Sequence, residues 1–243
     1  MKLSKKQQFF YTAFAFAVLG AAFNVMVLVE GFTEIRPANA IPVVAGLLFG
    51  PVGSAGCAVG NLIADCFGTL DLTSLLGMLG NFLAAFIPWK LWRLFSSEKP
   101  AVHSYRNLFL YIFLSYLSAT TVSWVLGFGL EYFFGQWIPE IYRYVFLNNF
   151  GFSLVLGLPL LIVLTSDSIR IEPDSSSEMY FKKKHLFHIP VKYFKILVFL
   201  YTAVMTVILS GVFRNCHLGN SVFITFCSVT AALLLFVLTV SPF

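Results

Sequence analysis

Residues 34–65 read EIRPANAIPVVAGLLFGPVGSAGCAVGNLIAD. A charged, proline-bearing start leads into two uncharged apolar runs, 38–49 and 52–64, which flank Gly50-Pro51. The second run carries Asn61 and closes on Asp65. No other part of the chain is so dense in glycine, proline and polar residues set among apolar ones. The course of this stretch therefore decides the fold.

The composition is that of an integral membrane protein. The chain has 243 residues, of which 58% are hydrophobic and 11% charged, and the mean hydropathy is +0.84. Soluble domains carry about 25% charged residues. Unbroken apolar runs of helical length predict an all-α bundle, whereas a barrel would show short alternating segments. The net charge of +5 follows from loop composition and does not indicate a nucleic-acid surface.

The apolar residues fall into segments that predict membrane helices and a first span that is not cleaved. These segments are 9–29, 38–49, 52–67, 72–95, 108–130, 144–165, 193–213 and 221–240. A polar and then basic stretch, 167–192, is the one clear linker. It divides the chain into a membrane domain, 1–166, and a C-terminal transmembrane helix pair, 193–243.

The stretch 38–67 either crosses the membrane once or enters and turns back. As one helix, 38–64 would span about 40 Å, which is long for a hydrocarbon core of about 30 Å, and Pro51 would interrupt it. If the chain turns back at Gly50-Pro51, the three basic clusters share one side. The positive-inside rule favours this reading and predicts a plasma-membrane protein with a cytoplasmic N-terminus. These clusters are Lys2, Lys5 and Lys6; Lys90, Arg93, Lys99 and Arg106; and Arg170, Lys182, Lys183, Lys184, Lys192 and Lys195.

Three motifs carry a resemblance to a known family. Arg36-Pro37 is followed by Ile41-Pro42, then by GLLFGPVG at 46–53, and then by Gly60-Asn61 with Asp65. This pattern resembles the S components of energy-coupling factor (ECF) transporters, the substrate-binding membrane subunits of bacterial and archaeal vitamin importers. In that family a short second helix ends in a Phe-Gly-Pro turn. The resemblance covers 9–165 and implies a six-helix bundle, to which the C-terminal pair is an addition.

The resemblance implies vitamin or micronutrient uptake. An S component captures a small vitamin-like molecule from outside and delivers it together with a coupling membrane subunit and two ATPases. The first helix of many S components docks the coupling subunit through an Ala-x-x-x-Ala motif. Ala13, Ala17 and Ala21 have this spacing and are the candidate docking residues. The alternative is close packing inside the bundle, where small residues four apart are also frequent.

The first candidate substrate-binding residues lie near the first outer loop, which caps the pocket in S components. They are Glu34, Arg36 and Asn39. The alternative for Glu34 and Arg36 is an ordinary interfacial charge pair. Asn61 and Asp65 are four residues apart and so share a helix face. Polar side chains within a bundle usually have a partner or a function, although Asp65 could also be solvated at the outer end.

Four further candidates come from the later segments. Asn81 follows Gly77 and Gly80, where backbones can approach closely, and a structural bond across helices is the favoured reading. Asn148 and Asn149 are expected to open the sixth segment, with helix capping as the alternative. Trp124 offers a ring on which a flat heterocycle can stack. The alternative for Trp124 is the interfacial aromatic belt.

No pattern in the chain indicates catalysis, a metal or another cofactor. The four histidines lie in predicted loops without metal-ligand spacing, and no G-x-x-x-x-G-K phosphate loop is present. We therefore expect a binding subunit and not an enzyme, with partner ATPases driving uptake. The main alternative is a membrane sensor or assembly protein that reuses the S-component fold, because the linker and C-terminal pair are extra. A lipid-modifying membrane enzyme ranks last.

Overall fold

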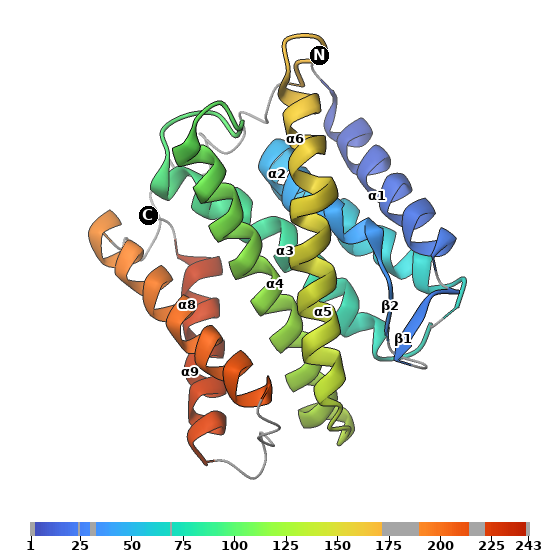
Figure 1. Ribbon diagram of the computed structural model, residues 1–243, viewed down its shortest axis with the longest axis vertical. Coiled ribbons are helices and arrows are strands. Elements are labelled where there is room, and N and C mark those ends of the chain that lie inside the picture. Colours follow the sequence, from blue (N-terminus) through green and yellow to red (C-terminus); the bar gives the residue numbers. More distant parts are fainter. Residues whose placement is uncertain are drawn as a thin grey trace.

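The hydrophobic segments form long helices in the computed structural model, which describes residues 3–23, 25–29, 33–68, 70–171, 190–213 and 222–241 (Figure 1). In chain order, the helices are α1 (Lys5–Ala22), α2 (Ile41–Asp65), α3 (Ser74–Phe95), α4 (Tyr105–Phe134), α5 (Pro139–Phe152), α6 (Leu158–Thr165), α8 (Val191–Phe213) and α9 (Val222–Val240). A 3₁₀-helix, η1 (Pro37–Ala40), precedes α2, and a π-helical turn, η2 (Ser153–Gly157), joins α5 to α6. Two short strands, β1 (Val27–Val29) and β2 (Thr33–Glu34), pair antiparallel.

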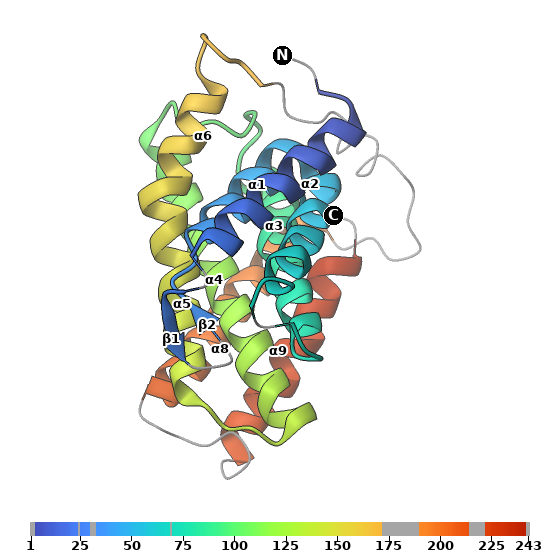
Figure 2. The same ribbon diagram turned by 90° about the vertical axis from the view of Figure 1, so that its right-hand side faces the viewer.

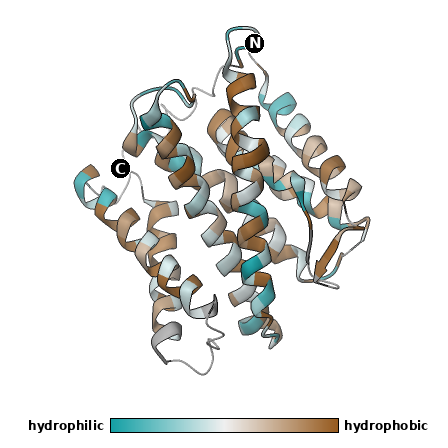
Figure 3. Cartoon of the chain, in the orientation of Figure 1, coloured by the Kyte–Doolittle hydropathy of each residue, from teal (hydrophilic) through white to brown (hydrophobic). Residues whose placement is uncertain are grey.

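The expectation of an all-α membrane protein is confirmed at this level. Five helical stretches are long and apolar enough to cross a membrane: Pro37–Asp65, Ser74–Phe95, Tyr105–Phe134, Pro139–Thr165 and Val191–Gly211. Hydrophobic residues dominate most of their length, and hydrophilic residues gather at the start of α1 and in the connection before α4 (Figure 3). These five stretches are the ones found among the described residues.

The expected first span, 9–29, is wrong in its second half. The helix α1 ends at Ala22, and Val27–Val29 pairs with Thr33–Glu34 in the β1–β2 ribbon. Val25, Val27 and Val29 alternate along this segment, and β-branched residues at every second position favour extended backbone over helix. The prediction, which was based on hydropathy alone, therefore extended the first span beyond the end of α1 at Ala22.

The turn at Gly50 shows that α2 is a helical hairpin. Gly50 has φ 59° and ψ −137°, a combination that is essentially restricted to glycine. A Cβ on Gly53 would lie 2.4 Å from the carbonyl oxygen of Ala45, whereas residues eight apart in a straight helix are about 12 Å apart. Arg36, before the first arm, bonds to Asn61 near the end of the second arm. The chain therefore goes in and comes back, as the basic clusters predicted.

The two ends of the bundle differ in what they carry. The start of α1, the connection between α3 and α4, and the end of α6 lie at one end of the molecule (Figures 1 and 2). The connection between α4 and α5 lies at the opposite end in both views. The first of these ends carries Lys5 and Lys6, Lys99, and Arg170, and the positive-inside rule predicts the cytoplasmic side for it.

The alanines expected to dock a partner pack inside the bundle instead. Ala13 and Ala17 are 6% and 8% exposed. A Cβ on Gly60 of α2 would lie 2.7 Å from the carbonyl oxygen of Ala13, and one on Gly20 would lie 2.6 Å from the Cβ of Ala64. Such close approach between backbones is the usual effect of small residues in membrane helices. Ala13 and Ala17 therefore pack against α2, as the alternative of close packing inside the bundle describes, while Ala21 is partly exposed. The docking role of the three alanines stays a prediction.

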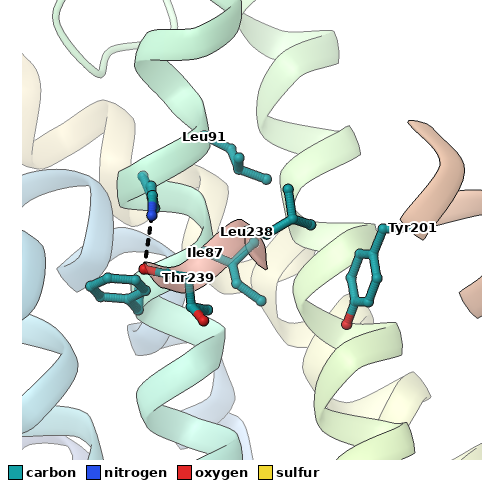
Figure 4. A pocket seen from close by; sticks show the side chains of 7 residues that line it. Ile87, Leu91, Tyr201, Leu238 and Thr239 are labelled. Atoms are coloured by element: carbon teal, nitrogen blue, oxygen red, sulfur yellow. Dashed lines mark hydrogen bonds between the residues drawn. The ribbon is translucent and has the colours of Figure 1, made fainter. Parts of the chain in front are cut away.

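The C-terminal pair packs directly on the helices before it. The helix α8 contacts α4 and α5, and α9 packs on α8. The hydroxyls of Thr121 and Tyr201 are 2.9 Å apart in a buried contact between α4 and α8. The Nζ of Lys90 donates to the carbonyl oxygen of Thr239 at 2.8 Å, and a dashed line marks this bond beside the labelled Thr239 in Figure 4. Lys90 is 1% exposed, and the carbonyl end of α9 is a favourable partner for a buried cation.

Candidate binding site

A buried cavity lies where η1, α2, α3, α4 and α5 meet. Its lining comprises Arg36, Asn39, Asn61, Gly77, Asn81, Val122, Leu126, Val145, Asn148 and Asn149. Six of the nine predicted substrate-binding residues are in this set, and they come from segments far apart in the sequence. The cavity volume is about 30 Å³. This is room for water but not for a vitamin-sized molecule, whose pockets measure about 300–1,000 Å³.

Arg36 is the centre of the polar contacts. It immediately precedes Pro37, whose fixed φ suits the first position of η1. One guanidinium nitrogen donates to Asp65 Oδ1 at 2.8 Å, and the other donates to Asn61 Oδ1 at 2.9 Å. The side chains of Arg36 and Asp65 are 13% and 5% exposed. Hydrogen bonds that involve a charged group are stronger than neutral ones in a poorly solvated site. The two bonds of the Arg36 guanidinium therefore hold the start of η1 against the end of α2.

The asparagines extend this network across two helices. The Nδ2 of Asn61 donates to Asp65 Oδ2 at 3.0 Å. The Nδ2 of Asn81 donates both to Asn61 Oδ1 and to the carbonyl of Gly77, each at 3.0 Å. A Cβ on Gly77 would lie 3.0 Å from Asn61 Nδ2, so glycine leaves room for this contact. The favoured structural reading of Asn81 therefore matches its position, and the residue also lines the cavity.

Some polar groups in the lining have no partner within the described part of the chain. Asn39 is 5% exposed and its side-chain amide bonds to none of the described residues. The Oδ1 of Asn81 likewise lacks a hydrogen-bond partner there. Leaving a buried polar group unsatisfied costs about 1–3 kcal/mol, so such groups usually meet water or a ligand. These two side chains are the ones best placed to bind a molecule in the cavity.

The two adjacent asparagines lie within α5 and not at its start. The helix α5 begins at Pro139, so Asn148 and Asn149 fall in its second half. Helix capping, the alternative for these residues, is therefore excluded. The backbone nitrogen of Arg36 lies 3.5 Å from Asn148 Oδ1, and Asn149 Nδ2 donates to the carbonyl of Val145 at 2.9 Å. Both residues contribute to the wall formed by α5.

Three predicted residues do not line the cavity. Asp65 lies behind Arg36, where it bonds to the guanidinium. Glu34 ends β2, and its side chain is outside the described part of the structure. Trp124 is buried elsewhere and stacks on Phe128 with ring centroids 5.3 Å apart. About 100° per residue separates helix positions, so Trp124 points away from the face of α4 that lines the cavity.

The apolar wall of the cavity was not predicted. It consists of Val122 and Leu126 from α4 and Val145 from α5. Positions 122 and 126 are four apart and share a helix face, but apolar residues lie all along α4, so nothing marked this face in advance. The cavity thus combines an amide-rich side with an aliphatic side.

The lining residues indicate binding by hydrogen bonds and apolar contact. Among the described residues no group of three or more histidine, cysteine, aspartate or glutamate side chains could hold a metal ion. The fold and the cavity together define a multi-pass helical membrane protein with a buried polar site. Comparisons with protein-family models, with curated proteins and with solved structures find no match to this chain.

Proposed function

We propose that the protein is a substrate-binding membrane subunit that captures a small vitamin-like molecule for an ECF-type importer. The observation that carries this proposal is the convergence of Arg36 and five asparagines on one cavity inside an apolar bundle. Polar side chains are costly inside a membrane, where they usually serve a substrate pathway or pair with one another. Here the Arg36 network pairs some of them, while the amide of Asn39 stays available.

Ligand binding requires this cavity to enlarge. Its present volume of about 30 Å³ suits water. In the proposed function this enlargement requires η1 to shift against the bonds that tie Arg36 to Asn61 and Asp65. In the proposed function, the substrate displaces water and shifts η1 outward. Asn39 and Asn81 then bind the substrate in place of water.

Uptake would depend on partners. The chain lacks a G-x-x-x-x-G-K phosphate loop, so a coupling subunit and two ATPases would supply the energy. Ala13 and Ala17 are buried against α2. A coupling subunit that approaches α1 would therefore meet the exposed side of this helix, where Phe10 and Phe14 are 60% and 59% exposed.

A pull-down from native membranes tests the partner assignment. The tagged full chain is extracted in mild detergent, and the eluate is identified by mass spectrometry. We expect a membrane coupling subunit and two ATPases, and we expect Phe14→Asp to lose them. Phe109→Asp is the matched control, because Phe109 is similarly exposed but lies on α4. If neither ATPase appears while a known importer stays intact in the same detergent, the sensor or assembly alternative replaces the transporter.

A further inference from the structure

We propose that Asp65 sets the charge selectivity of the site by neutralising Arg36, so that the site takes uncharged molecules with an amide-like edge. This inference rests on the proposed function and assigns its substrate class. Asp65 does not line the cavity. Its role is therefore that of a positioning residue that acts through Arg36, and not that of a ligand contact.

The first support is the balance of charge. Arg36 is the one ionisable side chain in the cavity lining, and the Asp65 carboxylate lies 2.8 Å from its guanidinium. Each carboxylate oxygen has a partner: Arg36 donates to Oδ1, and Asn61 donates to Oδ2. Opposite charges at this distance and burial cancel strongly. The charges of Arg36 and Asp65 thus balance within this pair.

The second support is the chemistry of the remaining lining. Asn39 offers an amide, and Asn81 Oδ1 offers an acceptor, that are not bonded within the described part of the chain. A side-chain amide pairs in a bidentate manner with a donor–acceptor edge, as asparagine does with adenine. The aliphatic side chains of Val122, Leu126 and Val145 complete the lining. This combination suits a flat, uncharged ring with an amide or amidine edge, such as a nucleobase, nicotinamide or a lactam.

A charged ligand would be disfavoured for a simple reason. An ion must lose its hydration to enter, and a neutral site offers no opposite charge in return. Removing the Asp65 carboxylate would change this balance, because the guanidinium would lose that counter-charge. The same site would then favour anions. Adding a carboxylate at position 61 would shift the balance in the opposite direction and favour cations.

The test separates ligands by charge. A metabolite extract of the producing cells is divided by ion exchange at neutral pH into neutral, anionic and cationic fractions. Each fraction is dialysed against the purified full chain, and bound compounds are identified by mass spectrometry. We expect compounds to be retained from the neutral fraction. Retention from the anionic or the cationic fraction instead would overturn the inference while leaving a small-molecule-binding function in place. Retention from no fraction would overturn the proposed function itself.

Two variants test the role of Asp65 through opposite changes of charge. Asp65→Asn should raise binding of anionic relative to neutral compounds about tenfold or more, and Asn61→Asp should do the same for cationic compounds. Asp71→Asn is the matched control, because Asp71 is exposed at the start of α3 and bonds to Thr73. If Asp65→Asn is too unstable to purify, Asp65→Leu, which removes the same charge, takes its place. If the variant still binds compounds with the same preference between neutral and charged ones as the wild type, Asp65 has a structural role and does not set the charge selectivity.

Discussion

Arg36 joins two parts of the chain that are far apart in the sequence. Its guanidinium reaches Asn61 and Asp65 at the end of α2, while its backbone lies beside Asn148 of α5. One residue thereby connects the helical hairpin, through its side chain, to the cavity wall formed by α5, through its backbone. The stability of the site should consequently depend on this residue.

We expect Arg36→Met to lower the free energy of unfolding by about 2–4 kcal/mol. The substitution keeps the apolar stem but leaves the largely buried Asp65 carboxylate without this partner, and breaking a buried pair on one side is strongly destabilising. Thermal unfolding in detergent measures the effect. Arg106→Met is the control, because Arg106 is exposed and, among the described residues, bonds to the Phe95 carbonyl alone. The cost of this change should stay below about 1 kcal/mol. Equal losses in the two variants would contradict this account of Arg36.

At the scale of single residues, the sequence predicted the polar side of the site but not its apolar side. Asn61, Asn81 and Asn148 stand out because polar residues are rare in apolar segments. Val122 and Leu126 do not stand out, since α4 carries many other apolar residues. The prediction for Trp124 failed because residue type suggested stacking, whereas the helical period turns it away from the cavity.

The helical hairpin α2 depends on one glycine. Gly50 adopts φ 59°, and a Cβ there would lie 2.6 Å from Trp89 Nε1. Both the backbone conformation and the space exclude a larger residue. The turn at Gly50-Pro51 is the feature that brings Asn61 back to Arg36.

Gly50→Ala should therefore be strongly destabilising, by about 2–3 kcal/mol or more, because it adds backbone strain to a steric clash. Gly151→Ala provides the matched control within α5, where an added Cβ meets no atom within 4 Å. That change should be neutral or stabilise by about 0.5–1 kcal/mol. Thermal unfolding of both variants in the same detergent provides the comparison. A mild effect of Gly50→Ala would mean that the hairpin turn is not built as described.

At the scale of elements, local chemistry predicted the hairpin but not the irregular turn between α5 and α6. Gly50-Pro51 and the basic clusters were visible in the sequence. The π-helical turn η2 was not, because tertiary contacts accompany it: the Tyr111 hydroxyl donates to the Ser153 carbonyl at 2.8 Å. A Cβ on Gly157 would lie 2.9 Å from the carbonyl oxygen of Ala40. Such contacts between distant segments leave no local pattern.

The topology of the whole molecule makes a prediction for labelling from outside the cell. In a version with its native cysteines replaced, single cysteines are introduced at Met26, Asp71 and Lys99. We expect a membrane-impermeant maleimide to label the first two and not the third, because the hairpin returns the chain to the outer side before α3. If 38–65 crossed once, Met26 and Lys99 would be labelled and Asp71 would be protected.

At the scale of the whole molecule, the packing position of the C-terminal helix pair could not be predicted from the sequence. The sequence indicated two further apolar helices after the linker 167–192 but not where they pack. The structure joins them to the earlier helices through Lys90, Thr121 and Tyr201. These residues gave no sign of their pairing, because hydroxyl groups and a single lysine in apolar segments have many possible partners.

The most direct test of the central claim is a comparison of the small molecules that co-purify with the wild-type protein and with its Asn39→Leu variant. This substitution removes an amide that bonds to no described residue, so the fold should persist while the ligand contact is lost. We predict a compound that is retained by the wild type and reduced about tenfold or more in the variant, with thermal unfolding nearly unchanged. Equal retention by both proteins, or no retained compound in the wild type, would contradict the assignment of this cavity as a binding site.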